Sequence, residues 1–433
     1  MAMHPRERRS GLWTPRPSRL TGYDRREFLR RSARTALTVP SAAALLAACG
    51  GDETSTTTNA NGSNTTWPQV AGIDLSRPDH PVELPLKGSA IADDLPIEKG
   101  PLKIYNWQDY ANPDMLEKFE SEFDVKIEWT SFAGMDEAVR KLDTGAVNFD
   151  LFFPTIDRIA TLVAKGYLQP LNLNYLPNLN NVWPELQDPF YDRGSRYSIP
   201  YVLWSDGIGW RSDLVDKTPD DYDNGWDMLW DPAFEGKIWV LDDDRDTLAM
   251  PIVRMGRVDD VNTEDRALLE QALDALREIN GVQISAESYQ KVADGSSPIH
   301  ATWSGDMLSA PGYLPDGVDA TTLRFWDQPD GRGVIGSDAV SIMAGAENPV
   351  LAHAFLNFIL DTDNALLNMT WNGYQAPLND IVADKLIADE FIPANLSAAV
   401  VEQADFEAGR QLMQLTPVAE KLWDDIFAEF KAG

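Results

Sequence analysis

Hydrophobic runs alternate with helical patterns from residue 102 to the end of the chain. Several runs are rich in Val, Ile and aromatic residues and are bounded by turn residues, which is typical of strands. They lie at 102–107, 125–130, 150–154, 197–204, 238–241 and 339–343. Because helical patterns stand between them, the chain is predicted to fold as an α/β protein, with helices layered on sheet.

The stretch NPDMLEKFESEF predicts the first of these helices. Asn112 suits the N-cap position, and Pro113 suits the first helical position. Leu116, Phe119 and Phe123 then fall on one face, which indicates a helix with one buried side.

Two later helices show the same kind of apolar face. The stretch TEDRALLEQALDALREI is predicted to be capped by Thr263, and a second stripe recurs every four residues near the C-terminus. The inward positions are Leu269, Ala272, Leu273 and Leu276 in the first helix and Val418, Leu422, Ile426 and Phe430 in the second. Such stripes are more often core than binding surface.

The first hundred residues have a different character. The stretch DRREFLRRSARTALTVPSAAALLAACGG has the basic, apolar and small-residue parts of an export signal, and its paired arginines resemble the twin-arginine type. The apolar part, 36–48, is shorter than the ~20 residues that span a bilayer, and it ends in a lipobox-like LAAC at Cys49. We predict a twin-arginine lipoprotein signal at 1–48 and a lipid-anchored flexible tether and lead-in at 49–100. An ordinary secretory signal and a basic disordered arm are the alternatives.

The chain is strongly acidic. Its formal net charge is -31, and residues 1–48 hold ten Arg and three acids, so the mature chain would carry about -38. Such a chain is repelled by nucleic acid and attracts cations, although solubility or adaptation to salt would give the same composition. The single cysteine leaves the mature chain without a disulfide, and its length suffices for two domains.

Sequence motifs for catalysis, metals and cofactors are absent. The three histidines after the signal, His80, His300 and His353, lack metal-ligand spacing. No nucleophile elbow, Walker loop or dinucleotide-binding glycine pattern occurs. Carboxylate or Ser/Lys catalysis stays open, but the sequence favours a protein that is not an enzyme and needs no metal or cofactor.

Trp and Tyr recur beside acids in YNWQDY, YVLWSDG, ATWSGD and NGYQAP, and acids cluster in LDDDRD after a predicted strand. Ligands of α/β sheets bind at the carboxyl ends of strands. An aromatic face attracts a cation, and a carboxylate forms a charge-assisted hydrogen bond with an ammonium group. The recurrence predicts a cage for an amine, whereas any one Trp alone is better explained by core packing.

Several segments resemble, in order and spacing, the spermidine/putrescine-binding group of ABC-transporter solute-binding proteins. They are LKIYNWQDYANPDMLEKFESEFDVKIEW, DLFFPTIDRIATLVAKGYLQPL, YSIPYVLWSDGIGWRSD, WDPAFEGKIWVLDDDRD and NGYQAPLN. The resemblance spans about residues 101–433. It implies a two-lobed, type II periplasmic-binding-protein-like fold with a hinge and an interlobe ligand cleft. One lobe would comprise 101–208 and 338–378, and the other 209–337 and 379–433.

The resemblance also implies a ligand site. Its aromatic walls would be Trp107, Tyr110, Trp303 and Tyr374, its acids Asp243, Asp246 and Asp338, and its small hydroxyl Thr155. Two positions depart from the family pattern, because Gly336 replaces a tryptophan and Asp157 replaces an aromatic residue. One or two walls of the cage would thus be lost and a carboxylate gained at Asp157.

We therefore expect a monomeric receptor, lipid-anchored at the extracytoplasmic face of the bacterial cytoplasmic membrane. It would bind a putrescine- or spermidine-type polyamine and deliver it to an ABC permease, without a nucleic acid partner. A same-fold receptor for another cationic or amine-containing solute, a cell-surface hydrolase with a carboxylate pair and a sensor component are the alternatives. The sequence leaves open which amine is bound and whether the role is transport or sensing.

Overall fold

A computed structural model describes residues 55–58, 64–132, 134–145 and 147–433. In this part of the chain, nine strands form one mixed sheet in the order β10-β9-β11-β8-β13-β7-β5-β6, with β12 also paired to β8. The strands are β5 (Leu102–Trp107), β6 (Ile127–Phe132), β7 (Leu151–Phe152), β8 (Ser198–Arg211), β9 (Ile238–Val240), β10 (Gln283–Ile284), β11 (Ile299–Trp303), β12 (Leu323–Asp327) and β13 (Ile335–Ile342). β5–β7 and β9–β11 are parallel groups, and β8 and β13 run antiparallel to their neighbours.

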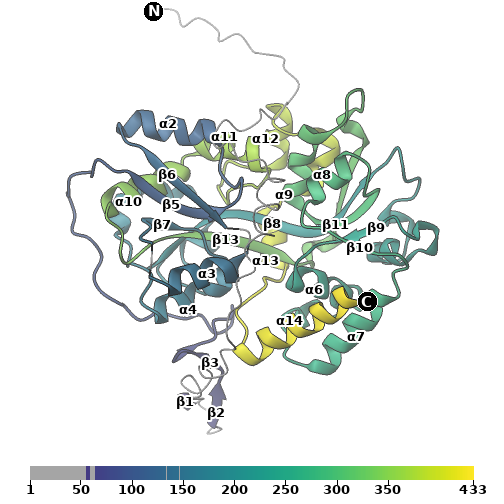
Figure 1. The fold of residues 1–433 in the computed structure, drawn as a ribbon, viewed down its shortest axis with the longest axis horizontal. Coiled ribbons are helices and arrows are strands. Elements are labelled where there is room, and N and C mark those ends of the chain that lie inside the picture. The colour runs from purple at the N-terminus through teal and green to yellow at the C-terminus, as the bar shows by residue number, and fades with distance from the viewer. Residues whose placement is uncertain (1–54, 59–63, 133, 146) are drawn as a thin grey trace, which may run out of the picture.

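β8 joins the two halves of the sheet (Figure 1). Its residues up to Ser205 pair with β13, and those from Asp206 onward pair with β11 and β12. Every residue of β8 is buried except Trp204, which is partly exposed. The strand therefore passes from one half of the molecule to the other at Trp204–Asp206.

Helices cover both faces of the sheet (Figure 1). They are α2 (Pro113–Phe123), α3 (Met135–Asp143), α4 (Ile159–Ala164), α5 (Pro184–Gln187), α6 (Asp244–Arg254), α7 (Arg266–Arg277), α8 (Ser288–Ala293), α9 (Ser304–Ser309), α10 (Pro349–Ile359), α11 (Thr362–Asn372), α12 (Ala383–Ala388), α13 (Gln403–Ala408) and α14 (Pro417–Ala432). Near β5–β7, α2 and α10 contribute Phe119 and Phe355 to one core, and α3 and α4 contribute Ala138 and Leu162 to another. A third core, which includes Trp423, lies among α6, α7, α14 and β9–β11.

The boundaries of the first predicted elements are confirmed. β5 spans the predicted residues, and α2 begins at Pro113 after the N-cap Asn112, whose side chain accepts a hydrogen bond from the Asp114 backbone N–H. β8 continues seven residues beyond the predicted end at Trp204, because its second half gains new partners in β11 and β12.

Two predictions about later helices are wrong. α7 is capped by Asp265 rather than Thr263, because the Asp265 carboxylate accepts from the Ala267 backbone N–H. Val418 is 82% exposed rather than part of the inward stripe of α14. The buried face of that helix begins at Ala419, so Val418 in the first turn lies beside it.

Short strands occur within residues 49–100, the range predicted to be a tether and lead-in. β1 (Ser55–Thr58) pairs with β2 (Asn64–Trp67), and β3 (Gln69–Val70) pairs with β4 (Ile73–Asp74). The β-branched threonines of β1 and β2 favour extended backbone. Cys49 and the predicted signal lie outside the described residues. Within the described ranges, no helix has the length and apolar character needed to cross a membrane.

Candidate ligand-binding site

The candidate site lies where β8 and β13 cross the middle of the sheet. Trp204 stands directly opposite Gly336 in the register of these antiparallel strands. A Cβ atom added to Gly336 would lie 2.0 Å from Cζ2 of Trp204, so the indole fills the space that a side chain at 336 would need. The position predicted to have lost an aromatic wall thus has an aromatic ring over it, from the neighbouring strand.

Three aromatic rings form a row beside this crossing. Tyr374 makes edge contacts with Tyr110 and with Trp204, with centroid separations of 5.6 and 6.5 Å. A Cβ atom at Gly305 would lie 2.4 Å from the Tyr374 ring, so only glycine leaves room for the ring there. Edge-to-face contacts of this kind are favourable, and they fix the order Tyr110, Tyr374, Trp204.

Asp338 stands at the Tyr110 end of this row. It is 4% exposed, and its Oδ2 accepts a hydrogen bond of 2.8 Å from the Tyr110 hydroxyl. Burial raises the pKa of Asp338 to about 7, against the lowering effect of that hydrogen bond. Its backbone forms a β-bridge with Thr155, which brings this predicted site residue to the same place.

Three carboxyl groups gather at the other end. Asp243 is the N-cap of α6, and its Oδ1 accepts from the backbone N–H groups of Arg245 and Asp246 at 2.9 and 3.1 Å. Asp246 is 7% exposed, and Asp206 on β8 is 6% exposed. Burial, followed by the charges of neighbouring carboxylates, raises the pKa of Asp243 to about 8 and that of Asp246 well above its usual range.

Asp206 belongs to the same group by its contacts. Burial raises its pKa to about 8, a hydrogen bond with Asp246 lowers it, and the charges of Asp243 and Asp327 raise it. Val202 is the residue of β8 opposite Asp338. Asp206 lies four residues further along the strand, so the backbones of the two acids are ~13 Å apart along β8.

Trp303 and Asp306 complete this end. Trp303 is the last residue of β11 and lies directly opposite Asp206. Its indole N–H is close enough to Asp246 to lower the pKa of that carboxyl group, although the two groups do not form a hydrogen bond of ordinary geometry. Asp306 on α9 accepts a hydrogen bond of 2.8 Å from the Tyr374 hydroxyl. Asp306 lies on α9 and Tyr374 follows α11, so this hydrogen bond connects two elements that border the candidate site.

Asp157 forms a direct ion pair. Its Oδ2 lies 3.1 Å from Nε of Arg158, whose Nη1 lies 3.1 Å from Oε1 of Glu420 on α14. Arg245 carries the other nearby positive charge, which acts on Asp157, Asp243 and Asp246. Its guanidinium stacks 4.7 Å from the Trp423 ring centroid and donates to Asn262.

Trp107, at the end of β5, is half-buried and packs against Phe132 with ring centroids 4.8 Å apart. Trp204, Asp206 and Asp306 are further candidate residues that were not predicted, although they lie in the segments YVLWSDG and ATWSGD. The alternation of side chains along a strand could have indicated Trp204 and Asp206. Residues two apart on a strand point to the same face, so these two side chains are expected on one face of β8.

Several buried polar atoms of the site have no hydrogen-bond partner within the described part of the chain. They are one oxygen each of Asp206, Asp246 and Asp338 and the indole nitrogens of Trp107, Trp204 and Trp303. Buried polar groups are normally paired, so the unpaired acceptors indicate a place for N–H donors from outside the protein. The same part of the chain holds no group of three His, Cys, Asp or Glu side chains placed to bind a metal ion.

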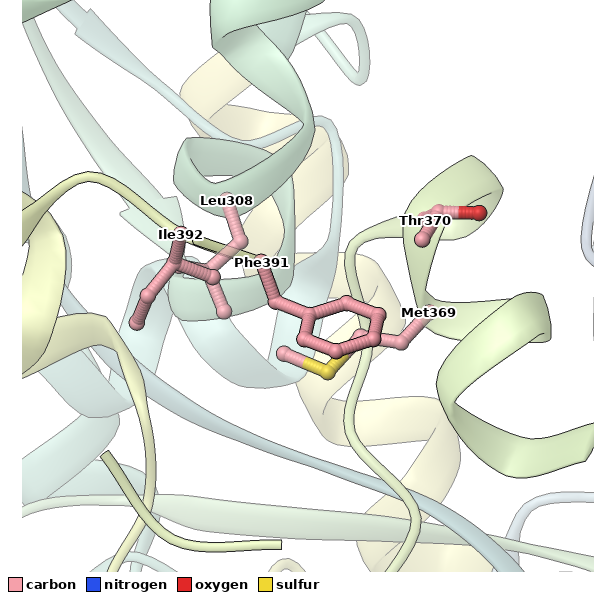
Figure 2. Close-up of a pocket in the computed structure, with 5 residues that line it drawn as sticks. All are labelled: Leu308, Met369, Thr370, Phe391 and Ile392. Atoms are coloured by element: carbon pink, nitrogen blue, oxygen red, sulfur yellow. The ribbon is translucent and has the colours of Figure 1, made fainter. Parts of the chain in front are cut away.

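A separate small pocket shares none of these residues. Figure 2 shows it between α9, α11 and the loop after α12, lined by Leu308, Met369, Thr370, Phe391 and Ile392. The Thr370 hydroxyl points away from the Phe391 ring, and no charged side chain lines the pocket. An amine would find no counter-charge there.

Residues 114–395 match the family model described as bacterial extracellular solute-binding protein. The chain belongs to this family. A spermidine/putrescine-binding periplasmic protein of Salmonella typhimurium is 26% identical over 340 residues, which cover 77% of this chain and 92% of the relative. A putrescine/cadaverine-binding protein of Pseudomonas aeruginosa is 28% identical over 277 residues, covering 61% and 75%.

Solved structures share the fold. The spermidine/putrescine substrate-binding protein of Streptococcus pneumoniae superposes with a TM-score of 0.63 at 24% identity, over 76% of this chain and 98% of that one. This match confirms the predicted α/β periplasmic-binding-protein fold. The family match confirms the prediction of a binding protein rather than an enzyme.

Proposed function

We propose that the protein is a receptor that binds a polyamine outside the cytoplasm and delivers it to an ABC permease. The observation that carries this proposal is the arrangement of buried acids with unpaired oxygens at both ends of a row of aromatic rings. A chain of methylene groups with an ammonium at each end would satisfy both features. The rings would cover the methylenes, and the carboxylates would accept from the ammonium groups.

The relatives support the same ligand class, since those of Salmonella typhimurium and Pseudomonas aeruginosa are named for spermidine, putrescine and cadaverine. The charges argue against other solutes. An anion would need Arg side chains or helix N-termini, whereas here the N-terminus of α6 is already capped by Asp243.

Binding would couple to closure of two lobes about the β8–β13 crossing. Tyr110 and Asp338 would hold the ligand from the first lobe, and Asp243, Asp246 and Trp303 from the second. A ligand that contacts both lobes binds the closed state more tightly than the open one, and it therefore shifts the population toward closure.

The N-terminal predictions complete this proposal. Export by the twin-arginine pathway and lipidation of Cys49 would anchor a monomeric receptor beside its permease, at the outer face of the cytoplasmic membrane. Metabolic labelling with a radioactive fatty acid should mark the wild type but not a Cys49→Ala variant. Absence of label from the wild type would contradict the lipid anchor without affecting the ligand proposal.

Isothermal titration calorimetry of the purified full chain tests the ligand class. The panel would contain putrescine, cadaverine, spermidine, spermine, arginine, γ-aminobutyrate and maltose. We expect a Kd at or below micromolar for at least one polyamine and no binding of maltose. Tight binding of arginine or γ-aminobutyrate alone would favour the second candidate, a receptor of the same fold for another amine-containing solute. No heat with any amine would refute the proposal.

A further inference from the structure

Trp204 and Asp206 have no role in the predicted site, yet they lie next to its residues Gly336, Tyr374 and Trp303. They are two residues apart on β8, so their side chains leave the same face of the strand. Trp204 is opposite Gly336 on one neighbouring strand, and Asp206 is opposite Trp303 on the other. Both therefore stand at the point where β8 passes between the halves of the sheet.

The Trp204 indole occupies the space that a side chain at position 336 would need. Any Cβ at position 336 would meet that indole at 2.0 Å. The aromatic surface at this place therefore comes from β8 and not from residue 336 of β13. Its Nε1 is buried without a partner in the described residues, and its ring contacts the edge of Tyr374.

The environment of Asp206 distinguishes a ligand site from an ordinary buried acid. Asp192, which is fully buried, accepts from the backbone N–H groups of Arg196, Tyr197 and Ser198 and from the Ser198 hydroxyl. Asp206 has an oxygen without any partner among the described residues and faces other acids.

Burying a carboxyl group in this way is costly unless a partner compensates it. Arg211, the buried cation at the end of β8, is engaged by Asp213 in a bidentate contact of 2.7 Å at each nitrogen. Arg245 contacts Trp423 and Asn262, and its charge acts on Asp243 and Asp246. No cationic side chain is among the groups that shift the pKa of Asp206, so its compensating cation is expected to come from the ligand.

We propose that Trp204 and Asp206 are ligand-binding residues, in which Trp204 forms an aromatic wall and Asp206 accepts a hydrogen bond from an ammonium group shared with Asp246. This inference rests on the proposed function and adds to it the chemistry of one end of the ligand. An ammonium with several N–H donors fits that end, because Asp206 and Asp246 each have a buried oxygen without a partner among the described residues. The ligand class is a diamine or polyamine with a primary amine at this end.

The test compares affinity and stability in four variants of the full chain, titrated with putrescine and spermidine. D206N is expected to weaken binding about tenfold to hundredfold. Above pH 8, where Asp206 is ionised, it should also raise the melting temperature of the ligand-free protein because it removes a like-charge contact. D192N is the matched control, since it alters a buried acid outside the site. It should lower the melting temperature and leave the Kd of the folded protein unchanged.

Trp204→Phe and the exchange variant W204G/G336W test the wall. Phe keeps a ring and should weaken binding by less than about tenfold. The exchange variant places the indole on β13, and its affinity should lie within about tenfold of the wild type. If D206N and W204F both bind as the wild type does, or if D206N only lowers stability, the inference is wrong and the proposed function stands. If the wild type itself binds no amine, both fall together.

Discussion

The two ends of the candidate site hold their carboxyl groups in different ways. At one end, Asp338 accepts a hydrogen bond from Tyr110, and Asp157 is the neighbouring acid whose charge raises its pKa. At the other, Asp206, Asp243 and Asp246 face one another, and repulsion adds to burial in raising the pKa of Asp243 and of Asp246. The first end is organised without a ligand, whereas the second stores unfavourable electrostatic energy that a cation would relieve. We infer that the carboxyl cluster supplies most of the affinity and Asp338 fixes the far end of the ligand.

The largest effect is expected when the cluster loses its charge. D243N/D246N should weaken polyamine binding by more than about a hundredfold, because two charge-assisted hydrogen bonds are replaced by neutral ones. Asn remains a good N-cap, so α6 should be preserved. Calorimetry measures the affinity, and circular dichroism checks the fold.

D242N is the control for that variant. Asp242 precedes the cap of α6 but is exposed and pairs with Lys431 on α14, so its loss should leave the Kd unchanged. If D243N/D246N and D242N bind polyamines with equal affinity, the inference that the carboxyl cluster supplies most of the affinity is contradicted.

A smaller loss is expected at the other end. D338N should weaken binding about tenfold, and Tyr110→Phe should have a smaller effect because it removes only the hydrogen bond that orients the carboxylate. Titration with putrescine and with longer spermidine separates two outcomes. If both ligands lose affinity equally, Asp338 contacts each of them. If only spermidine does, putrescine is held by the cluster alone.

The pH dependence should also separate the ends. A cationic ligand favours ionised carboxylates, and the pKa values are about 8 for Asp206 and Asp243 and about 7 for Asp338. Binding near pH 7 should therefore release protons, and affinity should rise with pH up to about 8. Calorimetry in two buffers of different ionisation enthalpy counts these protons. D206N should reduce the count, and an unchanged count would contradict the role of Asp206.

The same shifts make a prediction for the ligand-free protein. Between pH ~4 and 8 the folded state retains protons that the unfolded state has lost, so these acids destabilise folding as the pH rises. We expect the melting temperature of the wild type to fall more steeply over this range than that of D206N. Parallel melting curves would show that Asp206 does not titrate as inferred.

The smallest effect is expected at Asp157, which the sequence analysis placed in the site. Because Asp157 pairs with Arg158, D157N should change polyamine affinity by only a few-fold. The substitution should instead change how Arg158 is held, and with it the ion pair between Arg158 and Glu420. That ion pair joins η1 (Ile156–Arg158) to α14. A loss as large as that of D243N/D246N would place Asp157 among the ligand contacts.

Much of this protein follows from local sequence. The N-cap Asn112 with Pro113 and the strand LKIYNW are determined by nearest neighbours along the chain, and the structure has them as predicted. The residue types of the candidate site could also be recognised in the sequence, because its acids and aromatic residues cluster at the ends of predicted strands.

Tertiary structure decided the rest. The sequence shows a glycine at 336 and a tryptophan at 204 but cannot show that they face each other, since strand register is set by pairing between residues more than a hundred positions apart. The sequence likewise shows an acid at position 206 but cannot show that Asp243 and Asp246 lie close to it. Local chemistry therefore determined which residue types could bind an amine. Only the packing of distant strands decided which of them lie together, because cross-strand contacts and burial do not depend on spacing along the chain.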